Sequence, residues 1–173
     1  MDRRVTSAVT LAVLSGLCLL GLLFGIKAVT SDLPDDPIVK NPDSTCVDRE
    51  VTAGTKVFPE DVLVSVYNAG TRGGVASKTM STLQIRGFAA GKTDNEKGVD
   101  VKRVQVWGNP ANPAVQLVAA QFGDAAEITA GRVSQDHSAE GVVVVVGDDF
   151  DKLGKKVRHV TADQDATICS PFK

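Results

Sequence analysis

The valine-rich segments of the chain carry the clearest strand pattern. Val62, Val64 and Val66 alternate with Leu63, Ser65 and Tyr67, which is the period-2 pattern of a strand, and a Gly-rich turn follows. Five consecutive valines at 142–146 predict a central strand buried on both faces. Weaker patterns predict further strands at 88–90, 101–107 and 126–129.

Two segments have apolar residues at helical spacing. The first covers residues 75–86 and is closed by a glycine; the second covers 113–122 and is opened by an Asn-Pro pair. The order β-α-β-β-α-β-β predicts an α+β domain in which two helices pack on one face of a small mixed β-sheet. We expect its core to span residues 59–153, with the first strand and the valine strand as the central pair.

An uncharged segment precedes this domain. Residues 5–26 contain no charged side chain, and as a helix of ~1.5 Å rise per residue they would be roughly 33 Å long, enough to cross a ~30 Å hydrocarbon core. Arg3 and Arg4 favour a cytoplasmic position for residues 1–4, so the chain after the span should be extracytoplasmic. A cleaved signal peptide is the alternative, but its apolar region would be shorter and no A-x-A site follows. We therefore expect one uncleaved transmembrane signal anchor in the cell membrane.

The composition changes after this segment. Residues 27–45 contain three prolines and several acids, which predicts an extended tether without a core of its own. The extracytoplasmic domain should then cover residues 46–173. We expect a turn-rich lead-in at 46–59 and a tail at 154–173.

Three cysteines are present, and two of them lie near the ends of the predicted domain. Cys46 and Cys169 would be exposed to an oxidising compartment, which favours a disulfide between them. Such a bridge requires Cα atoms within about 4.4–6.8 Å and would hold the tail against the domain. Cys18 falls inside the apolar segment, where it acts as a soft apolar residue.

The best candidate for a binding site is the Gly-rich turn after the first strand. Its residues are Asn68, Gly70, Arg72, Gly73 and Gly74. Backbone N–H groups at the start of a helix, together with a guanidinium, could bind an anion such as a glycan phosphate. The alternative is a purely structural turn in which the glycines meet backbone requirements and the asparagine caps backbone groups. A P-loop is excluded because no Lys-Ser/Thr pair follows the glycines.

Acidic and basic residues cluster after the valine strand. Asp148 and Asp149 could serve acid–base chemistry, although capping of the adjacent turn is the favoured interpretation. The basic cluster at 152–159 is best explained as a solvated face. His137 and His159 have no spacing to cysteines or acids that would predict a zinc site. We therefore expect neither catalytic residues, nor a metal, nor a cofactor.

The charge balance bears on possible partners. The net charge is −2 and the basic residues are dispersed, so the chain has no nucleic-acid footprint. The expected partners are the membrane, through the N-terminal helix, and cell-wall polymer or envelope-assembly proteins.

Three segments resemble the LytR C-terminal domain of actinobacterial envelope proteins. They are VLVSVYNAGTRGGVA with the helix ending in RGF, VQVWG with the Ala-rich second helix, and VVVVVGDDF. The resemblance covers residues 62–150. In outline the whole chain is similar to Cei-type envelope integrity proteins, which carry one span, a tether and a lone domain of this kind.

The resemblance implies an accessory role at the envelope. The catalytic domain of LytR-CpsA-Psr phosphotransferases is not expected here, so the resemblance carries over no catalytic residues. We expect a membrane-anchored extracytoplasmic binding or scaffold protein that supports cell-wall assembly or integrity. The alternatives are a hydrolase or transferase that uses Asp148, Asp149 and Arg72, or an accessory partner of a phosphotransferase of that class.

Overall fold

The computed structural model describes residues 15, 45–131 and 139–172. The predicted anchor, the tether before Thr45, Cys18 and His137 lie outside these residues, apart from Ser15. In the described part of the chain, no helix is both long and apolar enough to cross a membrane.

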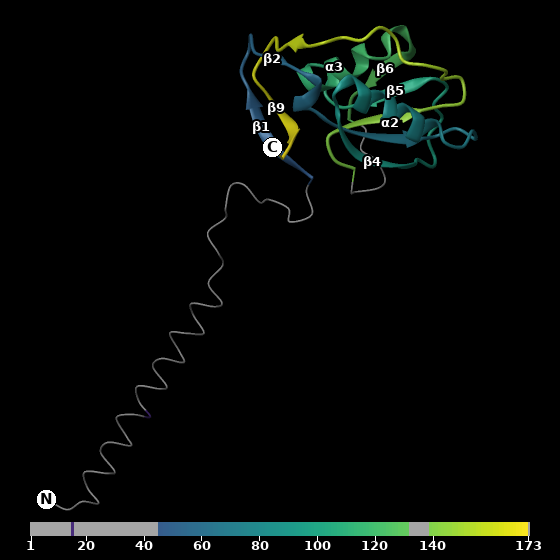
Figure 1. The fold of residues 1–173 in the computed structure, drawn as a ribbon, viewed down its shortest axis with the longest axis horizontal. Helices are drawn as coiled ribbons and strands as arrows, with labels where there is room; N and C mark the ends of the chain where they lie inside the picture. Colours follow the sequence, from purple (N-terminus) through teal and green to yellow (C-terminus); the bar gives the residue numbers. More distant parts are fainter. Residues whose placement is uncertain (1–14, 16–44, 132–138, 173) are drawn as a thin grey trace, which may run out of the picture. The chain divides into compact units, whose positions relative to one another are not determined.

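A five-stranded mixed sheet forms the centre of the domain (Figure 1). Its strand order is β4-β3-β7-β5-β6. The β7 strand is parallel to β3 and antiparallel to β5, and both outer pairs are parallel. The strands are β3 (Leu63–Asn68), β4 (Ala89–Asn95), β5 (Val104–Trp107), β6 (Ala126–Thr129) and β7 (Val142–Val146). The predicted central pair, β3 and β7, is confirmed.

Two α-helices cover one face of this sheet, as predicted. The first, α2 (Val75–Arg86), ends at Gly87, whose φ of 108° suits a residue without a Cβ. The second, α3 (Pro113–Ala120), is capped by the side chain of Asn112, which accepts a hydrogen bond of 2.9 Å from the Ala114 amide. It ends two residues earlier than predicted because the chain tightens into the 3₁₀ turn η2 (Gly123–Ala125).

Both faces of β7 are buried, which explains its unbroken valine run. Val142, Val144 and Val146 belong to the hydrophobic core beneath the helices. Val143 and Val145 belong to a second cluster on the opposite face, together with the buried rings of Tyr67 and Trp107. Burial on both faces removes the need for alternating polar positions.

The β4 strand is longer than the sequence pattern indicates. A strand was expected at 88–90, followed by a polar loop, but pairing with β3 continues as far as Asn68 opposite Asn95. The register shifts once along the pair, between Val64 and Val66. Since β4 lies at the edge of the sheet, its polar side chains remain in water while its backbone completes the ladder.

The lead-in at 46–59 was expected to be turn-rich, and this was wrong. It forms β1 (Cys46–Val51) and β2 (Lys56–Val57), followed by the 3₁₀ turn η1 (Pro59–Asp61). These strands pair antiparallel with β9 (Ala166–Pro171) and β8 (Val160–Thr161), so the two ends of the domain lie side by side (Figure 1). Backbone pairing with the returning tail supplies the order that the lead-in lacks on its own.

A disulfide fastens these paired ends. Cys46 and Cys169 are bonded, with Cα atoms 5.5 Å apart, so the predicted bridge is confirmed. The hydrophobic core also extends beyond the expected limits of 59–153, because four buried residues of the paired ends belong to it: Val51, Val57, Ala162 and Ile168.

Candidate functional site

The Gly-rich turn after β3 is held together by Asn68. This side chain is buried, and its Nδ2 donates to the carbonyls of Gly70 and Arg72 at 3.3 and 2.9 Å. Its Oδ1 accepts from the amide of Gly70 at 3.1 Å. The asparagine thus performs the capping function that the structural interpretation of this turn requires.

The amides that follow in this turn bind a carboxylate of the protein itself. Asp148 accepts hydrogen bonds from the Thr71 amide at 2.8 and 3.0 Å, from the Thr71 hydroxyl at 3.0 Å and from the Arg72 amide at 3.0 Å. The Arg72 Nε lies 3.8 Å from the same carboxylate. The chemistry expected for an external anion is therefore provided by an internal one.

The approach of Asp148 explains two further properties of the turn. A Cβ at Gly70 would lie 2.4 Å from the Asp148 Oδ1, so the turn requires glycine there. The hydrogen bonds donated by the backbone of Thr71 and Arg72 hold the pKa of Asp148 below its ordinary value. The favoured interpretation of Asp148 was capping of the turn after β7, but the turn that its carboxylate caps is the one after β3.

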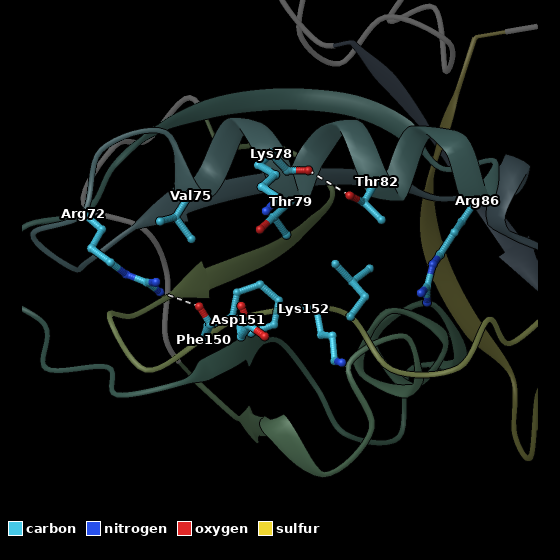
Figure 2. Close-up of a pocket in the computed structure, with 10 residues that line it drawn as sticks. Arg72, Val75, Lys78, Thr79, Thr82, Arg86, Phe150, Asp151 and Lys152 are labelled. Carbon is cyan, nitrogen blue, oxygen red and sulfur yellow. Dashed lines mark hydrogen bonds between the residues drawn. The ribbon is translucent and has the colours of Figure 1, made fainter.

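The other candidate groups of this turn are Gly73, Gly74 and the side chain of Arg72, and they do not share the contacts of Asn68. Gly74 is the N-cap of α2, with a φ of 80°. No atom lies within 4 Å of a Cβ built on Gly73 or on Gly74. The guanidinium of Arg72 reaches the carbonyl of Phe150, to which its Nη2 donates (Figure 2). Binding of an outside ligand by this turn stays a prediction.

The two acids directly after β7, Asp148 and Asp149, lie in different environments. Asp148 already accepts several hydrogen bonds, and a lowered pKa makes it a poor proton acceptor. Asp149 is exposed, and its amide donates to the carbonyl of Lys102 at 2.8 Å. Within the described ranges, no cluster of three or more histidine, cysteine or acidic side chains could hold a metal ion.

A groove of about 410 Å³ lies between α2 and the segment after β7. Figure 2 shows the helix along one wall and Phe150, Asp151 and Lys152 along the other, with Arg72 and Arg86 at opposite ends of the helix. The lining residues are Arg72, Val75, Lys78, Thr79, Thr82, Arg86, Phe150, Asp151, Lys152 and Leu153.

The lining of the groove is strongly cationic. It contains four basic side chains and a single acid, Asp151. Lys78 and Lys152 are exposed, and no carboxylate of the described residues forms an ion pair with either. Positive charge that is not neutralised inside the protein can bind an anion from outside.

Arg86 is fixed at its end of the groove by neutral acceptors. Its Nη2 donates to the carbonyl of Gly154 at 2.6 Å, and its Nη1 donates to the Gln121 Oε1 at 3.0 Å. Partial burial lowers the pKa of the guanidinium, although arginine keeps its charge at neutral pH. Gln121 is fully buried and also donates to the carbonyl of Val157 at 2.9 Å, which connects α2 and α3 to the tail.

Sequence reasoning did not identify this groove. Lys152 was noted as part of a basic cluster, and Arg72 as part of the Gly-rich turn, but Lys78 and Arg86 were not singled out. A signal was present, because residues 78, 82 and 86 follow one another at intervals of four and thus share one side of a helix.

Comparison with known proteins places the domain in a family. The family model described as LytR cell envelope-related transcriptional attenuator matches residues 61–150, just over half of the chain. None of the curated proteins matches. The chain is similar to a solved structure, the soluble domain of a conserved hypothetical secreted protein from Mycobacterium marinum. It is 25% identical, with a TM-score of 0.46 over 61% of this chain and 69% of that one. The extent of the family match shows that this chain belongs to the LytR C-terminal domain family, which is described as cell envelope-related.

Proposed function

We propose that this protein is a membrane-anchored, extracytoplasmic module that binds envelope components and supports cell-wall assembly or integrity without catalysis of its own. The observation that carries the proposal is the contrast between two neighbouring sites. The most promising carboxylate, Asp148, is engaged in holding a turn. The cationic groove beside it offers charged groups to a ligand.

The proposed location is supported by three independent features. The family is described as envelope-related, and the similar protein from Mycobacterium marinum is described as secreted. The Cys46–Cys169 bridge is typical of proteins outside the reducing cytosol. Residues 5–26 are uncharged and long enough to serve as the anchor. Alkaline phosphatase fused after Lys173 should therefore be active, whereas a reporter that works only in the cytoplasm should be inactive there.

The absence of catalysis is tested with Asp149→Asn in a strain that lacks the native gene. Asp149 is exposed and would be the free acid or base of a hydrolase or transferase, and within the described residues its side chain forms no ion pair that the change would disturb. Under the proposal, we expect the strain without the gene to be more sensitive to wall-targeting antibiotics, and this variant to restore resistance as well as the unaltered gene does. Full loss of resistance with normal protein levels would support an enzyme instead.

The partners in this proposal are wall polymers or envelope-assembly proteins, including a phosphotransferase of the LytR-CpsA-Psr class. Crosslinking in whole cells, followed by purification of the full chain, separates these possibilities by the chemical nature of the captured material. Capture of a polymer that resists protease and is degraded by wall hydrolases would support direct polymer binding. Capture of a single phosphotransferase in equal amounts would support the accessory role.

A further inference from the structure

We propose that the groove between α2 and residues 150–153 binds one extended polyanionic strand, a polymer with regularly spaced phosphodiester or carboxylate groups. This inference rests on the proposed binding function and names the class of ligand. It starts from the lining, which holds four basic side chains, Arg72, Lys78, Arg86 and Lys152, and one acid, Asp151. Asp148 lies outside the lining and pairs with Arg72 at 3.8 Å, so the four basic groups still exceed the two acids. An anionic ligand would neutralise charge that the described residues leave in excess.

The spacing of the basic side chains along the groove favours an extended polymer over a small ion as the ligand. Arg72 precedes the first turn of α2 and Arg86 closes its last turn, so the helix separates them (Figure 2). Twelve residues at ~1.5 Å per residue give a helix of roughly 18 Å. A single phosphate or carboxylate cannot contact both arginines over that length, whereas a polymer that lies along the helix can contact them in succession.

The two arginines are held in place before any ligand arrives. Arg72 donates to the carbonyl of Phe150, and Arg86 donates to the carbonyl of Gly154 and to Gln121. Binding therefore does not have to order these long side chains, and the loss of their conformational freedom does not oppose it. Each guanidinium has more donors than these contacts use, so it can also bind a ligand oxygen.

The two lysines complete the groove with exposed charges. Lys78 lies on the helix wall and Lys152 on the opposite wall, so together they flank the space between the arginines (Figure 2). Lysine binds phosphate as a point charge and tolerates variation in the position of the anion. Thr79 and Thr82 line the same wall, but Thr79 is buried and the Thr82 hydroxyl donates to the carbonyl of Lys78 at 2.9 Å, so the charged side chains carry the proposed contacts.

Fluorescence anisotropy with the purified full chain in neutral detergent tests the proposal. The probes are labelled poly(glycerol phosphate) and labelled polygalacturonate, with inorganic phosphate and glycerophosphoglycerol as small competitors. The test variant is Lys78→Glu combined with Lys152→Glu. The matched control is Lys56→Glu combined with Lys97→Glu, which changes the net charge equally at two exposed lysines outside the groove.

We expect the natural chain to bind at least one polymer with an affinity that falls as salt is raised, because exposed charges are screened. The groove variant should bind about tenfold more weakly or worse, since two attractive contacts become repulsive, while the control changes less than about twofold. The choice between the two polymers then identifies the anion. The small competitors should displace the probe only at a far higher concentration of anionic groups.

Three results would overturn the proposal. The first is equal weakening in the groove variant and the control, which would show unspecific attraction. The second is displacement by inorganic phosphate or glycerophosphoglycerol at the same concentration of anionic groups as the polymer, which would show a site for a small anion or lipid headgroup. The third is no binding of either polymer by a folded natural chain. None of them would affect the reporter fusion or the Asp149→Asn experiment, so failure here can be separated from failure of the proposed function.

Discussion

Replacing Gln121 by leucine should destabilise the domain more than its position near the end of a short helix would indicate. The side chain is fully buried, and its Nε2 donates to the carbonyls of Leu117 and Val157 at 3.2 and 2.9 Å. Its Oε1 accepts from Arg86 at 3.0 Å and from the amide of Val157 at 3.4 Å. Leucine has nearly the same size but can make none of these hydrogen bonds.

The expected loss follows from the groups left without a partner. The amide and the carbonyl of Val157 each lose a hydrogen bond in a half-buried position, where the penalty is about 1–1.5 kcal/mol per group. The weakened contact of Arg86 adds to this, and burial of an apolar leucine offsets roughly 1 kcal/mol of the total. We therefore expect a decrease of about 2 kcal/mol in the free energy of unfolding. For a domain of this size the melting temperature should fall by roughly 8 °C.

Urea denaturation of the full chain measures this difference through Trp107, which is the single tryptophan and is buried. Gln116→Leu is the matched control, because it removes one exposed hydrogen bond, to the carbonyl of Pro110, from the same helix. Water can replace that bond, so the control should lose less than about 0.5 kcal/mol. If the Gln121 variant were as stable as the control, the side chain would not hold the tail as the structure indicates.

Three further predictions follow from contacts between distant segments. Replacing Cys46 or Cys169 by serine should lower the free energy of unfolding by about 2–5 kcal/mol, as urea midpoints will show, because the bridge closes a loop of 123 residues. Asp148→Asn should lower the urea midpoint at neutral pH but not in acid. The folded pKa of Asp148 lies below its unfolded value, so its contribution is complete above about pH 4 and disappears as the pH falls through the folded pKa. Gly147→Ala should prevent normal folding, whereas Gly73→Ala should be tolerated. A Cβ at Gly147 would lie 1.7 Å from the carbonyl oxygen of Val101, whereas a Cβ at Gly73 would meet nothing within 4 Å. Soluble yield and circular dichroism report this difference.

Each of these predictions has a result that contradicts it. Two alkylatable thiols in the exported natural protein would rule out the bridge. A constant difference between Asp148→Asn and the natural chain from pH 7 to pH 3 would mean that the titration of this carboxylate does not govern the contact. Normal folding of Gly147→Ala would show that the backbone can move away from β7 without penalty.

Local signals predicted the elements that depend on neighbouring residues. The valine run specified β7, a glycine with positive φ ended α2, and the Asn-Pro pair opened α3. The polar half of β4 and the whole of β1 could not be recognised in this way. Their order comes from pairing with β3 and β9, and a backbone ladder does not require apolar side chains.

The candidate site was likewise predicted only where it depends on neighbouring residues. The pattern of the Gly-rich turn predicted a place where amides bind an anion, and the structure supplies that anion from Asp148, 77 residues away from Thr71. The contact follows from topology, because parallel neighbours such as β3 and β7 end at the same edge of the sheet. Because β3 and β7 were predicted to be the central pair, the contact between the turn after β3 and Asp148 after β7 could have been inferred from the sequence. The groove depends on the position of residues 150–153 against α2, which no local pattern specifies.

The place of β7 in the sheet has a consequence for the order of events during synthesis. This strand is the last of the five in the sequence, yet it lies between β3 and β5. At about 5–20 residues per second, the ribosome needs roughly 4–15 s to proceed from the end of β3 to the start of β7. Until β7 is made, the inner edge of β3, and later that of β5, has no partner strand in this chain and can pair with other chains. Changes within the valine run can therefore lower the yield of folded protein even when the finished domain is equally stable, because they delay the strand that joins the two halves.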